Sequence, residues 1–170
     1  VKDREARGYS YESADASFAL LARRMLGKVP EYFSVEQFDV NVEQRYNAVG
    51  ERVAVAMAVV KVKVDGETMI SAAEGNGPVN ALDVALRKDL GKYQPFISGL
   101  KLTDYRVRIL DPQEATRAVT RVLIESGDGT RHWGTVGVSE NIIEASWQAL
   151  LDSVEHKLYK DRAIQIPPAP

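Results

Sequence analysis

The sequence contains no cysteine, and this absence excludes several kinds of chemistry. Without cysteine the chain forms no disulfide, binds no metal through thiolates and has no cysteine nucleophile. Histidine is also scarce, because only His132 and His156 occur, and neither has a partner at the spacing of a metal motif such as HxH or HExxH. A chain without cysteine fits a reducing compartment, so we expect a cytoplasmic protein.

Long apolar runs and an excess of basic residues are missing as well. No segment approaches the roughly 18 to 20 apolar residues of a membrane span, and no signal-like segment opens the chain. The 22 lysines and arginines are balanced by 24 aspartates and glutamates, which leaves no basic field for non-specific phosphate binding. We therefore expect neither a membrane nor a nucleic acid among the partners.

Familiar catalytic motifs are absent too. The chain has no GxSxG motif, so a hydrolase would lack its nucleophile elbow. Its Gly75-Asn76-Gly77 turn matches neither GxGxxG nor a P-loop. What is present is a chain of 170 residues with 45% hydrophobic residues, which is long enough to bury the core of one domain.

The first 30 residues have a helical pattern. Ser13 is a candidate N-cap, and Ala14, Phe18, Leu21 and Met25 fall on one stripe before Gly27 and Pro30 end the run. The charged start at Val1 suggests that the chain is cut from a longer protein. We expect residues 1–30 to form a helical linker subdomain.

A strand, strand, strand, helix order follows. Alternation begins near residue 33, a long β-branched strand covers Val53 to Val64, and Asp65-Gly66 has the residues of a type I′ hairpin turn. A returning strand over Glu67 to Glu74 leads to a helix that begins at Pro78. Both faces of the long strand are apolar, which predicts cover on each side and therefore a homodimer.

The second half repeats this order. Strands are expected at 105–109, 118–124 and 130–138, with a hairpin turn at Asp128-Gly129 and a helix capped by Ser139. Asp65-Gly66 recurs 63 residues later, and Ala85-Leu86 recurs 64 residues later as Ala149-Leu150, which indicates an internal duplication. The sequence predicts an α+β fold of two βββα modules, about 31–95 and 98–160, related by a pseudo-twofold axis, preceded by linker helices and followed by a tail over 161–170.

The turn between the third strand and the first long helix is the most suggestive feature. Glycine lets a backbone approach a ligand closely, and the free N–H groups at a helix N-terminus suit a carboxylate or phosphate. The alternative is a tight turn that needs glycine for its geometry alone. The equivalent turn of the second module lacks this pair of glycines, which favours a specific role for the first.

Three segments resemble one known family. SAAEGNGPVNALDVALRK, LTDYRVRILD and WGTVGVSENIIEASWQALLDSVEHKL are similar to the C-terminal regulatory region of the 2-isopropylmalate synthase and citramalate synthase family. ARGYSYESADASFALLARRMLG is similar to the linker helices before that region in citramalate synthases. The resemblance extends from about residue 3 to about residue 160 and is strongest to the citramalate type.

The resemblance implies a regulatory domain without its own chemistry. The family transfers an acetyl group from acetyl-CoA on a TIM barrel that holds a divalent metal, so we expect no catalytic, metal or cofactor site in this chain and a catalytic barrel in the same polypeptide. It also implies a homodimer that binds a branched-chain amino acid, with isoleucine favoured over leucine. A purely structural dimerisation module stays open as the alternative.

Candidate effector residues combine the glycine turn, which suits the carboxylate, with apolar and polar neighbours between the first long helix and the following strand. Core packing is the alternative role for the apolar ones. The candidates are Gly75, Asn76, Gly77, Pro78, Ala81, Leu90, Tyr93, Ile97, Thr103, Tyr105 and Val107.

Overall fold

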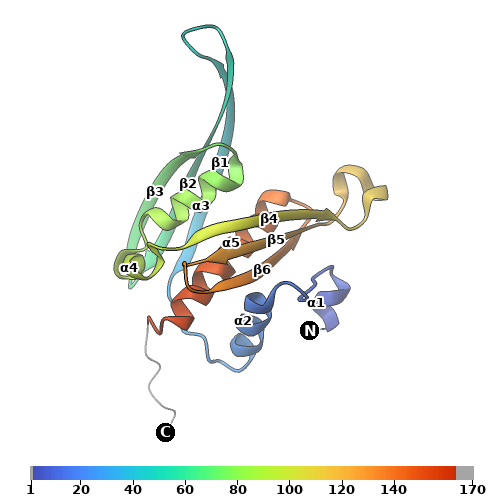
Figure 1. The fold of residues 1–170 in the computed structure, drawn as a ribbon, viewed down its shortest axis with the longest axis vertical. Coiled ribbons are helices and arrows are strands. Elements are labelled where there is room, and N and C mark those ends of the chain that lie inside the picture. Colours follow the sequence, from blue (N-terminus) through green and yellow to red (C-terminus); the bar gives the residue numbers. More distant parts are fainter. Residues whose placement is uncertain (1, 164–170) are drawn as a thin grey trace. The chain divides into compact units, whose positions relative to one another are not determined.

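The structure is a computed structural model, and it describes residues 2–163 (Figure 1). Residues Glu31–Ser98 form one compact unit, and the described residues before and after this segment together form the other. Each unit contains one three-stranded antiparallel sheet followed by a helix. The α+β class and the two βββα modules predicted from the sequence are therefore confirmed.

The first unit orders its sheet β1-β2-β3 and packs α3 against β2 and β3. Its elements are β1 (Ser34–Tyr46), β2 (Arg52–Val64), β3 (Glu67–Gly75), α3 (Pro78–Lys88), η1 (Gly91–Tyr93) and α4 (Gln94–Ile97). Asp65 and Gly66 join β2 to β3 with φ values of 49° and 84°, as a type I′ turn requires. Pro78 takes the first helical position, where its missing N–H costs nothing.

Strand β2 has two different faces. Ala56, Ala58, Val60 and Val62 alternate along the face covered by α3 and are at most 2% exposed. Met57, on the opposite face, is 46% exposed. β3 pairs with β2 only from Ala56 onward, so the far ends of β1 and β2 continue as a two-stranded ribbon (Figure 1). One apolar face of this sheet thus has no cover within the unit.

The second unit orders its sheet β4-β5-β6 and packs α5 against β5 and β6. Its elements are α1 (Lys2–Ala6), α2 (Asp15–Met25), β4 (Lys101–Ile109), η2 (Pro112–Arg117), β5 (Thr120–Gly127), β6 (His132–Ser139) and α5 (Ile142–Lys160). Helix α2, which the sequence assigns to a linker, contacts both α5 and β6. The segment before residue 31 is therefore packed with the second module.

The predicted hairpin turn at Asp128-Gly129 is confirmed, but it is built differently from the turn at Asp65-Gly66. The hairpin after β5 is a longer turn in which Gly129 has a positive φ of 90° but Asp128 does not. Asp128 instead accepts hydrogen bonds from the N–H groups of Thr130 and Arg131, so its carboxylate, and not its backbone, builds the turn.

The buried face of α2 also differs from the prediction. The N-cap is Ala14 and not Ser13, and Ala16, Ser17 and Leu20 are the buried residues of the helix. Phe18 and Met25, which belong to the stripe seen in the sequence, are 44% and 74% exposed. Small side chains bring this helix close to its neighbours, and a stripe of large apolar residues does not detect such a contact.

The duplication extends into side-chain packing. A Cβ on Gly75 would lie 2.5 Å from the backbone nitrogen of Ala81, and a Cβ on Gly137 would lie 1.8 Å from the backbone oxygen of Ala145. Ala81 and Ala145 are both fully buried, occupy the fourth position of their helices and are 64 residues apart in the chain. In each module a glycine on the returning strand allows the first turn of the helix to pack closely on the sheet.

Candidate functional site

The first turn of α3 exposes free backbone donors. Its N-cap is Gly77, in an extended conformation with φ of −163°, and it has no side chain to cap the helix. The N–H of Ala81 already bonds to the carbonyl of Gly77 at 3.0 Å, and Pro78 has no N–H. Within the described chain, the N–H groups of Val79 and Asn80 have no hydrogen-bond acceptor. Two donors at the positive end of the helix macrodipole are therefore available to an anion.

The corresponding helix of the second module, α5, has a side chain that caps its first turn. Its N-cap is Asn141, which lies 64 residues after Gly77, and its side chain accepts from the N–H groups of Ile143 at 2.9 Å and Glu144 at 3.4 Å. The prediction that Ser139 is this N-cap was wrong. The Ser139 hydroxyl accepts from the N–H of Asn141 at 3.1 Å and donates to the Glu144 carboxylate at 2.9 Å.

The two glycines of the first turn have different roles. Gly75 is required by geometry, because any Cβ there would collide with the backbone of α3 at Ala81. Gly77 faces open space, with no atom within 4 Å of where its Cβ would lie, and its φ is one that any residue adopts. Close packing therefore explains Gly75 and leaves Gly77 unexplained. Asn76 lies between them and donates its N–H to the side chain of Asn80 at 3.2 Å.

The structure separates the candidate residues into three groups. The turn residues and Ala81 lie together at the start of α3. Leu90, Tyr93 and Ile97 are at most 1% exposed and belong to the core of the first unit. The other three lie on β4 in the second unit, namely Thr103, Tyr105 and Val107. The assignment of these residues to an effector site stays a prediction.

One of the three candidate residues on β4 makes a hydrogen bond within its own module. The Tyr105 hydroxyl lies 2.9 Å from the hydroxyl of Ser146 on α5. Val107 is 42% exposed, and Thr103 is an exposed residue at the bulge between Leu102 and Asp104. Of these three, Tyr105 is thus held by its own module, whereas Thr103 and Val107 remain accessible.

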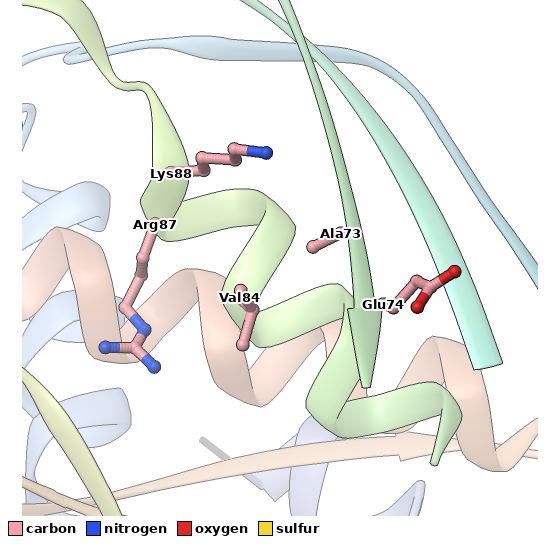
Figure 2. Close-up of a pocket in the computed structure, with 5 residues that line it drawn as sticks. All are labelled: Ala73, Glu74, Val84, Arg87 and Lys88. Carbon is pink, nitrogen blue, oxygen red and sulfur yellow. The ribbon is translucent and has the colours of Figure 1, made fainter. Parts of the chain in front are cut away.

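A pocket that the sequence does not reveal lies beside α3. Figure 2 shows it between β3 and α3, lined by Ala73, Glu74, Val84, Arg87 and Lys88, with a volume of about 460 Å³. Lys88 reaches toward β3, where its ammonium donates to the carbonyl of Ala72 at 2.9 Å. The Arg87 guanidinium leaves α3 in another direction and pairs with Asp83. The pocket combines an apolar floor with groups of both charges, a composition that suits a zwitterion.

His156 is a buried titratable group on α5. Its side chain packs against Trp133 with ring centroids 5.5 Å apart, and its Nδ1 atom has no hydrogen-bond partner among residues 2–163. Burial and the positive charge of Lys160 lower the pKa of His156 to about 4. The neutral ring is therefore the form that the fold accommodates.

This burial predicts a pH dependence of stability. The unfolded chain protonates this histidine near pH 6.5, but the folded chain does so only near pH 4, so the free energy of unfolding should fall by about 2 kcal/mol between these values. Urea titrations at several pH values in this range measure how steeply the free energy of unfolding depends on pH. His156→Gln should make this pH dependence weaker. His132→Gln, at an exposed position, should leave the pH dependence unchanged. Equal slopes for both variants would contradict the prediction.

Within residues 2–163, no three histidine, aspartate or glutamate side chains lie together in a way that could hold a metal ion. None of the helices described is long and apolar enough to cross a membrane.

The comparison with known proteins decides the family. The model of the LeuA allosteric (dimerisation) domain matches residues 12–158. The chain belongs to this family.

Several relatives are similar over nearly the whole chain. The (R)-citramalate synthase of Geobacter sulfurreducens is 52% identical over 165 residues, which are 97% of this chain and 31% of the relative. That of Synechocystis sp. is 49% identical over 158 residues, which are 93% of this chain and 29% of the relative. A 2-isopropylmalate synthase of Aquifex aeolicus is 36% identical over 107 residues, which are 63% of this chain and 19% of the relative. This LeuA-type domain thus spans about a third of the length of its citramalate synthase relatives.

Proposed function

We propose that this chain is the regulatory domain of a citramalate synthase, which binds isoleucine as a feedback inhibitor and holds two copies together. The single observation that carries the effector role is the uncapped first turn of α3 in a family of allosteric domains. The catalytic barrel of the same polypeptide would supply the transfer of an acetyl group from acetyl-CoA, with its divalent metal.

The chemistry of an amino acid suits the start of α3. Its carboxylate can accept from the free N–H groups of Val79 and Asn80, where the helix macrodipole favours negative charge. The absence of a side chain at Gly77 leaves space for a ligand. Charge-assisted hydrogen bonds of this kind are worth about 1.5 to 3 kcal/mol each. The neighbouring pocket of Figure 2 offers the apolar surface of Ala73 and Val84 to an aliphatic side chain.

Calorimetry tests this function directly. Isoleucine, leucine and valine are titrated separately into the protein, and isoleucine should bind most tightly and raise the melting temperature, because it binds only the folded state. Tightest binding of leucine would move the assignment to the 2-isopropylmalate branch of the family. The absence of heat with all three would leave a structural dimerisation module, the second candidate.

The dimer itself predicts a specific contact surface. The face of β2 opposite α3 presents Val53, Val55, Met57 and Val59, and Ile70 on β3 is 67% exposed. An apolar face of this kind needs cover. Met57→Lys should therefore shift the protein from dimer to monomer in sedimentation equilibrium at micromolar concentration. Ile109→Lys, on an exposed residue of β4, is the matched control and should remain dimeric. A wild-type monomer near 18.8 kDa would contradict the proposal.

A further inference from the structure

A second pocket lies within the unit that does not contain α3. It has a volume of about 240 Å³ and is bordered by α2, β6, α5 and the turn before β6. None of its residues belongs to the site proposed at the start of α3. The lining residues that matter here are Asp15 and Ala19 of α2, Arg131 of the turn, Trp133 of β6, and His156 and Lys160 of α5.

His156 is a polar group of this pocket that the fold leaves without a partner. Its side chain is only 6% exposed, and its Nδ1 atom makes no hydrogen bond to any of residues 2–163. The neighbouring Trp133, by contrast, donates its indole N–H to the hydroxyl of Ser153 at 3.2 Å. A buried polar atom without a partner is rare in folded proteins, because it destabilises them. The imidazole borders the pocket, so a molecule bound there can supply the missing partner.

Two cationic side chains also border the pocket. Arg131 already pairs with Asp128 at 2.7 Å and with Asp161 at 2.6 Å. Lys160 lies at the end of α5, is exposed, and has no ion-pair partner within the part of the chain that the structure describes. Arg131 is therefore largely neutralised by its partners, whereas the charge of Lys160 is not compensated.

The electrostatic potential at the ring of His156 is positive. Burial is the largest cause of its low pKa of about 4, and the positive charges of Lys160, Arg23 and Arg131 lower this pKa further. Asp15 is a carboxylate on the pocket wall and acts in the opposite sense. The positive charges outweigh this one negative charge, and such a potential attracts an anion.

The apolar part of the pocket limits the size and the kind of anion. Trp133 is 5% exposed and packs against His156 with ring centroids 5.5 Å apart, and Ala19 adds a small apolar side chain. A volume of about 240 Å³ is smaller than the roughly 300 to 1,000 Å³ of pockets for drug-sized ligands. The pocket therefore suits an anion with few heavy atoms and a short carbon chain.

We propose that this pocket binds a short-chain organic carboxylate, which pairs with Lys160, accepts a hydrogen bond from His156 and lays its carbon chain against Trp133. A neutral imidazole donates one hydrogen bond, and a protonated imidazole adds a positive charge. The anion therefore stabilises the protonated ring and raises the pKa of His156. Binding and protonation are linked, so the affinity for the anion rises as the pH falls toward this pKa.

The first test measures the pKa of His156 by NMR in the whole protein. Sodium acetate, sodium butyrate, sodium phosphate and sodium chloride are compared at equal ionic strength, over the pH range in which circular dichroism shows a folded chain. His132→Gln identifies the signals of the two histidines. Acetate or butyrate should raise the pKa of His156 by about 1 relative to chloride, which corresponds to about tenfold tighter binding to the protonated form. Equal pKa values in all four salts would overturn the site, and a rise with phosphate alone would overturn the carboxylate class.

The second test measures butyrate affinity from the indole signal of Trp133. Lys160→Gln should weaken binding about fivefold, because it removes the uncompensated charge. Lys101→Gln is the matched control, since Lys101 is an exposed lysine of the same unit that does not line the pocket. His156→Gln should make the affinity independent of pH between pH 4 and pH 6.5. Equal affinities in the two lysine variants would overturn the site and would leave the function proposed for α3 intact.

Discussion

Asp128→Asn is expected to lower the free energy of unfolding by about 2 to 3 kcal/mol, because it removes the charge from a buried ion pair. The Asp128 carboxylate accepts from the Thr130 hydroxyl at 2.8 Å and lies 3.0 Å from the ammonium of Lys157. The side chains of Asp128 and Lys157 are only 5% and 10% exposed. Burial alone would raise the pKa of Asp128, but hydrogen bonds from Lys157 and from the backbone of Arg131 and Thr130 hold it far below its usual range.

The duplicated fold supplies a matched control for this variant. Asp65 lies in the corresponding turn of the first module, is 63% exposed and pairs with Lys92 at the surface. Asp65→Asn should change stability by less than about 0.5 kcal/mol, because exposed ion pairs contribute little and Asn-Gly suits the same turn. Urea denaturation of both variants measures the difference. If both variants lost the same free energy of unfolding, burial would not strengthen the contacts of Asp128.

Gly77→Asn should lower the affinity for isoleucine about 10- to 100-fold while stabilising the protein. The variant copies Asn141 of the second module, whose side chain binds the N–H groups of its own helix. The same N–H groups of α3 would then be occupied, so an effector carboxylate would lose its donors. Gly77→Asp should have a larger effect on affinity, because it adds repulsion between like charges.

Gly77→Ala is the control for this pair. It adds a Cβ in open space and no hydrogen-bond acceptor, so it leaves the N–H groups free and should retain binding. Calorimetry and thermal denaturation together distinguish the outcomes. If Gly77→Asn and Gly77→Asp bind isoleucine as the wild type does, the start of α3 is not the carboxylate site.

Much of the fold could be predicted because its signals are local. The hairpin residues Asp65 and Gly66, the helix start at Pro78 and the alternation along β2 each depend on a few neighbours in the sequence. The repeat of about 64 residues then extended one module to the other, and both aligned dipeptides, Ala85-Leu86 and Ala149-Leu150, are buried. Local propensity and tertiary packing agree at these positions.

The features that the sequence did not predict have a different physical origin. Ser139, Glu140 and Asn141 are consecutive polar residues, and the sequence does not show which of them ends the strand and which caps the helix. The buried face of α2 depends on β6, which lies more than 100 residues away in the chain. The pocket beside α3 depends likewise on which residues of β3 face the helix. Such features depend on contacts that form only in the fold.

The cap on α5 has a consequence for stoichiometry. Two copies of one module would offer two equivalent helix starts per chain, but Asn141 fills one of them with a side chain and Gly77 leaves the other open. Of the two duplicated helices, α3 thus keeps a start without a side-chain cap and α5 does not, so the proposed site would occur once per chain and twice per dimer. A calorimetric isotherm for the wild-type protein should accordingly fit one ligand per chain, although the chain contains the βββα module twice.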